Sequence, residues 1–132
     1  MFEELIAEAE AVLKPRPLSS TAEAGSVAAA LLTKSGNIYT GVCIETARSM
    51  GFCAEHAAAS AMITAGESDI VKMVAINKRG NILPPCGRCR EFISQLNDEN
   101  IHADVLVNRK RSLKLSDLLP YDWRQSKMIE VE

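Results

Sequence analysis

Three of the four cysteines in this 132-residue chain stand where helices are predicted to begin, and this arrangement constrains the fold more than any other feature. Cys86 and Cys89 form a CxxC pair at one predicted helix start, so their thiols lie one turn apart on one face. Cys53 stands at the start of another predicted helix. Backbone N–H groups and the helix dipole at such positions stabilise thiolates, the form of cysteine that binds metals. The pattern therefore favours a fold in which two helix starts point at one metal ion.

The apolar pattern predicts helices that alternate with strands. Helical periodicity or alanine-rich composition predicts helices over residues 2–13, 54–65 and 86–96, and a short helical piece over 115–119. Apolar runs predict strands over residues 26–33, 38–42, 70–77 and 103–107, the first two joined as a β-hairpin. The basic segment 109–114 is predicted to be a solvated turn. Alternating elements favour one sheet with helices on both faces, in a single domain spanning residues 1–132.

The composition argues against several classes of protein. Lys+Arg and Asp+Glu number 15 and 17, and only 5% of residues are aromatic, which argues against a nucleic-acid-binding protein. No stretch approaches the roughly 18 apolar residues of a membrane span, and the acidic N-terminus lacks the features of a signal peptide. We therefore expect a cytoplasmic protein with no membrane partner, in which the cysteines are ligands or catalysts rather than disulfides.

The number of thiol ligands separates a catalytic zinc site from a structural one. Three thiolates leave one position of a tetrahedral zinc ion open, whereas a fourth would close it. Cys43 lies on a predicted strand, ten residues before Cys53, and is predicted to lie outside the ligand set. Glu55, two residues after Cys53, can face the open position and transfer protons there. The alternatives are a CxxC redox pair and a non-catalytic, zinc-stabilised binding module.

The paired motifs resemble a known family. The CAE sequence of Cys53–Glu55, followed by the PCGRC sequence of Pro85–Cys89, is similar to the signature of the zinc-dependent cytidine deaminases. The segment PCGRCREFISQL also resembles the blasticidin S deaminase-like branch of that superfamily, and the whole resemblance runs from about Ser26 to Trp123. It implies a three-layer α/β/α sandwich with a mixed, roughly five-stranded sheet, assembled as a homotetramer with sites at subunit interfaces.

The same resemblance implies the reaction and the residues that perform it. The reaction would be hydrolytic deamination of cytidine or deoxycytidine to the uracil nucleoside and ammonia, with blasticidin S or an N4-modified cytidine as alternative substrates. One zinc ion per chain would be held by Cys53, Cys86 and Cys89, and Glu55 would be the catalytic proton shuttle. The residues that would contact the substrate are Glu45, Cys43 in place of a ribose-binding Asn, Ala54 through its backbone carbonyl, and Trp123 from a neighbouring subunit.

The residue that follows the CAE motif departs from many relatives, which have Arg where this chain has His56. Zinc with three thiolates carries a net charge of −1, so a compensating positive charge is needed nearby. The sources that the sequence offers are the helix N-termini, His56, Arg88 and Arg90. His56 lies on an alanine-rich predicted helix, where a packed histidine is the simpler interpretation.

Overall fold

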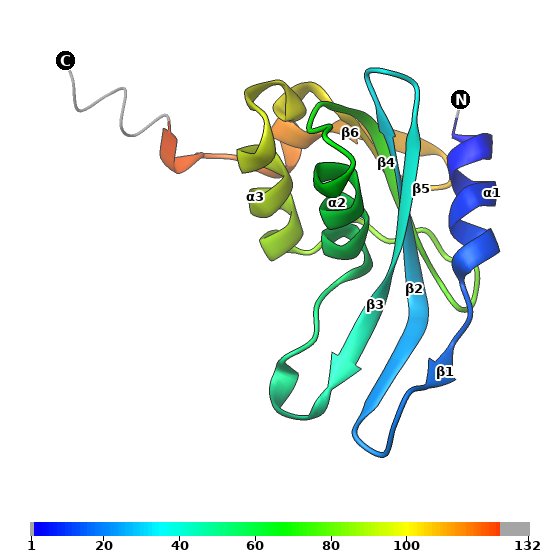
Figure 1. Ribbon diagram of the computed structural model, residues 1–132. Coiled ribbons are helices and arrows are strands. Elements are labelled where there is room, and N and C mark those ends of the chain that lie inside the picture. The colour runs from blue at the N-terminus through cyan, green and yellow to red at the C-terminus, as the bar shows by residue number, and fades with distance from the viewer. Residues whose placement is uncertain (1, 125–132) are drawn as a thin grey trace.

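The computed structural model describes residues 2–124, which form three α-helices and six strands (Figure 1). The helices are α1 (Glu3–Val12), α2 (Ala54–Thr64) and α3 (Gly87–Leu96). The strands are β1 (Arg16–Pro17), β2 (Ala22–Thr33), β3 (Ile38–Thr46), β4 (Ile70–Asn77), β5 (Asp104–Asn108) and β6 (Arg111–Lys114). Short 3-10 turns follow β3, α3 and β6, at Ala47–Ser49, Asp98–His102 and Leu115–Leu118. Among the described residues, no helix combines the length and the apolar character needed to cross a membrane.

The strands form one mixed sheet around β2. Strand β3 pairs antiparallel with one side of β2, while β1 and β4 pair with successive parts of its other side. Strand β4 is parallel to β5, as expected when a helix connects two neighbouring strands. The sheet has six strands rather than about five, because it includes two short strands, β1 and β6, that the apolar pattern did not predict. Segment 111–114 is the edge strand β6 and not a turn. Its exposed, basic residues are typical of a sheet edge and carry no apolar alternation.

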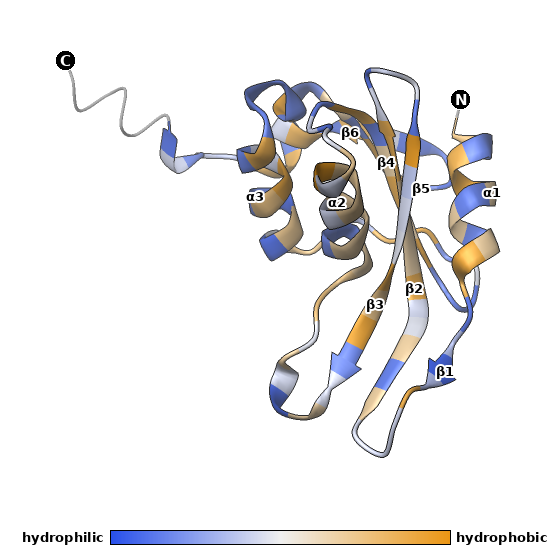
Figure 2. Ribbon diagram, viewed as in Figure 1, coloured by the Kyte–Doolittle hydropathy of each residue, from blue (hydrophilic) through white to orange (hydrophobic). Residues whose placement is uncertain are grey.

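Helices cover both faces of the sheet, so the predicted three-layer α/β/α sandwich is confirmed (Figure 1). Helix α1 packs its apolar side, including Leu5 and Ala9, against one face. The surface of α1 carries both apolar and hydrophilic residues, as its amphipathic pattern predicts (Figure 2). Helices α2 and α3 pack on the other face, where Met62 and Ile93 join the larger of the two apolar clusters.

Close packing between α2 and β3 depends on Gly41. A Cβ atom added to Gly41 would lie 2.3 Å from the backbone nitrogen of Ala58 and 2.7 Å from the Cβ of Ala57. Only a glycine lets the α2 backbone approach β3 this closely. Because Cys53 is the residue immediately before α2, this contact also determines where its thiol lies relative to the strand.

Candidate active site

The structure brings together the three thiols that the sequence places at helix starts. Cys53 caps the N-terminus of α2, Cys86 caps that of α3, and Cys89 lies in the first turn of α3. Their sulfur atoms all lie within 4.8 Å of one another, and those of Cys53 and Cys86 are 3.5 Å apart. A tetrahedral ion with Zn–S bonds of about 2.3 Å needs sulfur atoms about 3.8 Å apart. The cluster therefore fits three of the four positions around a zinc ion.

The surroundings of the three thiols affect their ionisation in different ways. Burial opposes ionisation of Cys86, but hydrogen bonds from the backbone of Cys89 and from the neighbouring thiols lower its pKa overall. Burial raises the pKa of Cys53 and of Cys89, and the nearby negative charges raise both further. Metal binding must therefore displace protons from Cys53 and Cys89, and a bound divalent cation would stabilise the thiolates that result.

Glu55 lies beside this cluster in the first turn of α2. Its side chain is 5% exposed, and it is the one carboxyl group among the described residues that is buried. Burial raises the pKa of Glu55. Its charge in turn raises the pKa of Cys53 and Cys89, which indicates that the carboxyl group is close to both thiols. A buried carboxyl group with a raised pKa, next to a possible metal site, is suited to proton transfer.

An open cleft of about 420 Å³ leads to the cluster. Side chains from β3 line it together with residues of the segment that precedes α2 and with one residue of α3. Among the residues that line it are Val27, Cys43, Glu45, Phe52, Cys53 and Arg88. The cleft therefore joins the two predicted sugar contacts, Cys43 and Glu45, to a thiol of the cluster. Ala54, the other predicted contact on this side, is fully buried at the first position of α2.

Cys43 lies outside the metal cluster, as the sequence predicts. The cluster consists of the other three cysteines. The Cys43 thiol is buried, and its sulfur atom lies 3.2 Å from the hydroxyl oxygen of Ser26. Sequence reasoning did not identify Ser26 as a site residue. The predicted strand began at Ser26, whereas β2 begins at Ala22 and includes Gly25, a residue that often marks an irregular strand backbone.

His56, Arg90 and Arg88 are the side chains that could balance the negative charge of the thiolates, and each has different surroundings. The His56 ring stacks between Phe52 and Phe92, at centroid distances of 5.1 and 4.4 Å, and burial lowers its pKa. His56 is thus a packed ring whose burial disfavours the protonated form. Arg90 donates from Nε to the Pro85 carbonyl at 2.7 Å and so ties α3 to the loop before it. Arg88, by contrast, lines the same cleft as Cys53.

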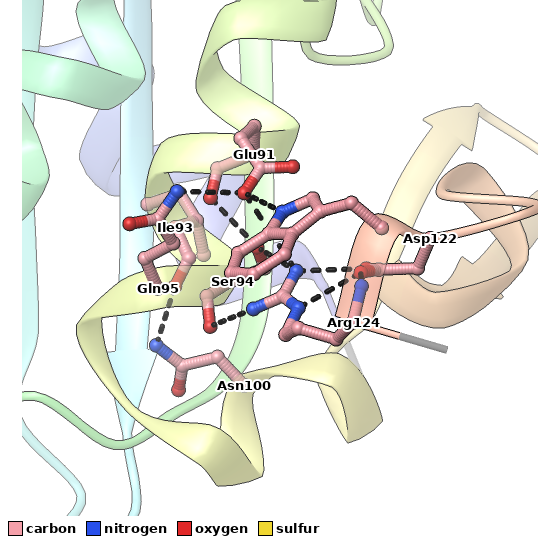
Figure 3. A network of polar contacts seen from close by, with 8 residues as sticks. Glu91, Ile93, Ser94, Gln95, Asn100, Asp122 and Arg124 are labelled. Atoms are coloured by element: carbon pink, nitrogen blue, oxygen red, sulfur yellow. Dashed lines mark hydrogen bonds and ion pairs between the residues drawn. The ribbon is translucent and has the colours of Figure 1, made fainter. Parts of the chain in front are cut away.

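Trp123 is not among the residues that line the cleft. It is 52% exposed, and its indole Nε1 donates to Glu91 on α3 at 3.0 Å. The neighbouring Arg124 donates to Asp122 and to Ser94, and its guanidinium group lies 5.2 Å from the centre of the indole ring. Figure 3 shows Arg124 between Asp122 on one side and Ser94 of α3 on the other. Within one chain, Trp123 is therefore separate from the cleft.

Comparisons with known proteins agree with this site. Residues 3–104 match a family model described as the cytidine and deoxycytidylate deaminase zinc-binding region. The chain is 31% identical over 96 residues to a cytidine deaminase of Mycobacterium tuberculosis, covering 72% of this chain and 70% of that protein. It is 34% identical over 98 residues to a cytidine deaminase of Halalkalibacterium halodurans, covering 71% and 74%. The crystal structure of a mutant M. tuberculosis cytidine deaminase superposes with a TM-score of 0.77 at 26% identity, covering 92% of this chain and 96% of that chain.

Proposed function

The chain belongs to the cytidine and deoxycytidylate deaminase family, and from that premise we propose that it hydrolyses cytidine or deoxycytidine to the uracil nucleoside and ammonia. The reaction depends on zinc, the ion in the family's description, for which the clustered thiols form a fitting site. One observation carries the proposal: a buried carboxyl group lies beside a three-thiol cluster at the end of an open cleft. Neither a redox pair nor a non-catalytic zinc module accounts for that carboxyl group.

The protein's own residues divide the chemistry between them. When bound, zinc supplies a Lewis acid that makes a water molecule nucleophilic near neutral pH. Cys53, Cys86 and Cys89 would hold the ion, as three of the four ligands that zinc takes in proteins. Glu55 takes a proton from the attacking water and delivers it to ring atom N3 as the new C–O bond forms at C4. It then takes the proton of the new hydroxyl on C4 and passes it to the amino group, so that the C4–N bond breaks and ammonia leaves. The backbone carbonyl of Ala54 accepts a hydrogen bond from the amino group and so orients C4 of the ring.

The burial of Glu55 suits it to both halves of this proton transfer. A carboxyl group that is exposed to water exchanges protons at acidic pH, far below the pH at which the enzyme would work. Burial raises the pKa of Glu55 and brings it closer to neutral pH, where one group can both accept and donate a proton. With 5% of its surface exposed, Glu55 also exchanges few protons with bulk solvent.

The remaining features of the proposal concern the substrate and the assembly. Glu45 accepts a hydrogen bond from a sugar hydroxyl, and Cys43 contacts the sugar beside it. Trp123 stacks on the pyrimidine ring in the cleft of a neighbouring subunit of a homotetramer, which fits its exposure and its distance from its own chain's cleft. The substrate is a free nucleoside and not a nucleic acid, which fits the near-balanced charge. The enzyme would act in the cytoplasm in pyrimidine salvage.

Ultraviolet absorbance of the zinc-loaded protein with a panel of substrates tests this function. The panel holds cytidine, deoxycytidine, an N4-substituted cytidine, blasticidin S and free cytosine. We expect turnover of cytidine or deoxycytidine with release of one ammonia per uracil nucleoside formed. The relatives' names favour this outcome over turnover of blasticidin S. Zinc-loaded, folded protein that converts neither nucleoside would contradict the proposal.

A further inference from the structure

Strand β2 bulges directly opposite Cys43. Ala24 pairs with Ile44 and Ala28 pairs with Val42, so residues 25–27 of β2 face one residue of β3. Gly25 makes the bulge possible, because its φ of +87° is unfavourable for other residues and an added Cβ would lie 2.2 Å from a backbone oxygen. Bulges of this kind redirect a side chain and are common next to active sites. Here the redirected side chain is that of Ser26.

Ser26 connects two of the β3 side chains that line the cleft, those of Cys43 and Glu45. Its hydroxyl donates to the Oε1 atom of Glu45 at 3.2 Å and lies 3.2 Å from the sulfur atom of Cys43. A serine hydroxyl has one hydrogen, and in this geometry Glu45 receives it. The Cys43 thiol must therefore donate to Ser26, so the hydrogen bonds run in one direction from the buried thiol to the exposed carboxylate.

This chain of hydrogen bonds fixes a carboxylate that would otherwise rotate freely. Glu45 is exposed near the end of β3, where a long side chain samples several rotamers. Binding of Oε1 by Ser26 restricts these rotamers, while Oε2 has no partner among the described residues. Because Cys43 and Glu45 are two residues apart on a strand, both point to the cleft side. Glu45 lines the cleft, so its second carboxylate oxygen is available to a ligand there.

We propose that Ser26 is a positioning residue for the sugar of the substrate: it holds Glu45 so that the free carboxylate oxygen accepts a hydrogen bond from a sugar hydroxyl. Cys43, which lies 3.2 Å from the Ser26 hydroxyl, then also helps to orient Ser26. This inference rests on the proposed function. The Glu45 carboxylate held by Ser26 can only accept hydrogen bonds. Recognition of the sugar therefore depends on a sugar hydroxyl that donates one.

Steady-state kinetics of the zinc-loaded holoenzyme with two substrates test the proposal. The substrates are cytidine and 2′,3′-dideoxycytidine, which lacks the sugar hydroxyls on its ring. For Ser26→Ala we expect KM for cytidine to rise about tenfold, while kcat stays within about twofold of the wild type. Without Ser26 the Glu45 carboxylate is no longer held in place, and a tenfold change corresponds to the free energy of about one hydrogen bond to a charged group. The kcat/KM for dideoxycytidine should not change. Ser26→Thr keeps the hydroxyl and should retain most of the affinity.

A double-mutant comparison separates positioning from a merely structural role. In a Glu45→Gln background, Ser26→Ala should have little further effect on KM, because the two residues act through one contact. Ser112→Ala, on the exposed edge strand β6, is the matched control for removing a strand hydroxyl. If Ser26→Ala folds poorly, Ser26→Cys keeps the volume with a weaker donor and should raise KM by a smaller factor.

Three results would overturn the role of Ser26: an unchanged KM for cytidine, an equal loss with dideoxycytidine, or an effect that adds in full to that of Glu45→Gln. Absence of turnover by the wild type would instead overturn the proposed function. In that case calorimetric dissociation constants for cytidine, compared between wild type and Ser26→Ala, still test the positioning role. Failure of the zinc-loaded wild type to bind cytidine would overturn both proposals.

Discussion

Replacement of Glu55 by glutamine tests the proposed proton transfer with the smallest change in shape. Glutamine occupies nearly the same volume and keeps a hydrogen-bonding oxygen, but it cannot take up or release a proton near pH 7. The side chain is 5% exposed, so bulk water has little access with which to replace the missing carboxyl group. The structure therefore places the expected loss in the upper part of the range for a general acid–base residue.

That range is about 10²- to 10⁴-fold, and we expect kcat of Glu55→Gln to fall by about 10³- to 10⁴-fold. The loss corresponds to about 4–5 kcal/mol of transition-state stabilisation. Because the metal cluster consists of three cysteines and does not include Glu55, the Glu55→Gln variant should still bind zinc. Stability should not fall, since burial disfavours the charge that the substitution removes.

The assay follows the decrease in cytidine absorbance. Zinc content, by atomic absorption, and thermal unfolding are measured on the same preparation. Glu8→Gln is the matched control, because Glu8 is exposed on α1 and lies across the sheet from the site. The control should retain wild-type kcat. A zinc-loaded Glu55→Gln enzyme with kcat within tenfold of the wild type would refute the assignment of proton transfer to Glu55.

Three further predictions concern the cluster, the hairpin and the packing of α2. Serine at any one cluster position should abolish tight zinc binding, whereas Cys43→Ser should keep full zinc content by metal analysis; zinc loss in Cys43→Ser would contradict the three-thiol site. Hydrogen bonds from Tyr39 and Asn37 lower the pKa of Glu67 to about 2, so its contribution to stability is present above the ordinary pKa of about 4.5 and is lost as pH falls towards 2. The difference in unfolding temperature between wild type and Glu67→Gln should shrink across that window, and a constant difference would count against it. Gly41→Ala should destabilise the protein by about 1–3 kcal/mol in urea unfolding, because the new methyl group collides with the α2 backbone; an unchanged midpoint would show that α2 can move away.

The elements that the sequence predicts well are those whose apolar pattern reflects burial. Strand β4 matches the predicted range 70–77, because it lies inside the sheet and its apolar residues form one continuous run. Helix α3 and the thiols at its start were predicted from a local signal, the proline and the CxxC pair. Strands β1 and β6 were missed, since both are short and exposed and no periodic apolar pattern marks them.

Two features of the candidate site depend on contacts between distant segments. The bulge that directs Ser26 towards Glu45 arises from the register of β2 on β3, and Gly25 was its only local trace. The network that places Trp123 against Glu91 joins the C-terminal segment to α3 through side chains that carry no motif. A local pattern identifies which residue types are present, whereas these contacts are determined by how the sheet and helices pack.

Zinc titration of the metal-free protein is the most direct test of the central claim, that three thiols and Glu55 form a catalytic zinc site. Cytidine deamination and bound zinc are measured together as the ion is added. We predict no turnover without zinc and a linear rise in activity that ends at about one equivalent per chain, as expected for a single three-thiol site with an open position. Full activity in the metal-free protein, or one bound zinc without any deamination of cytidine or deoxycytidine, would contradict the claim.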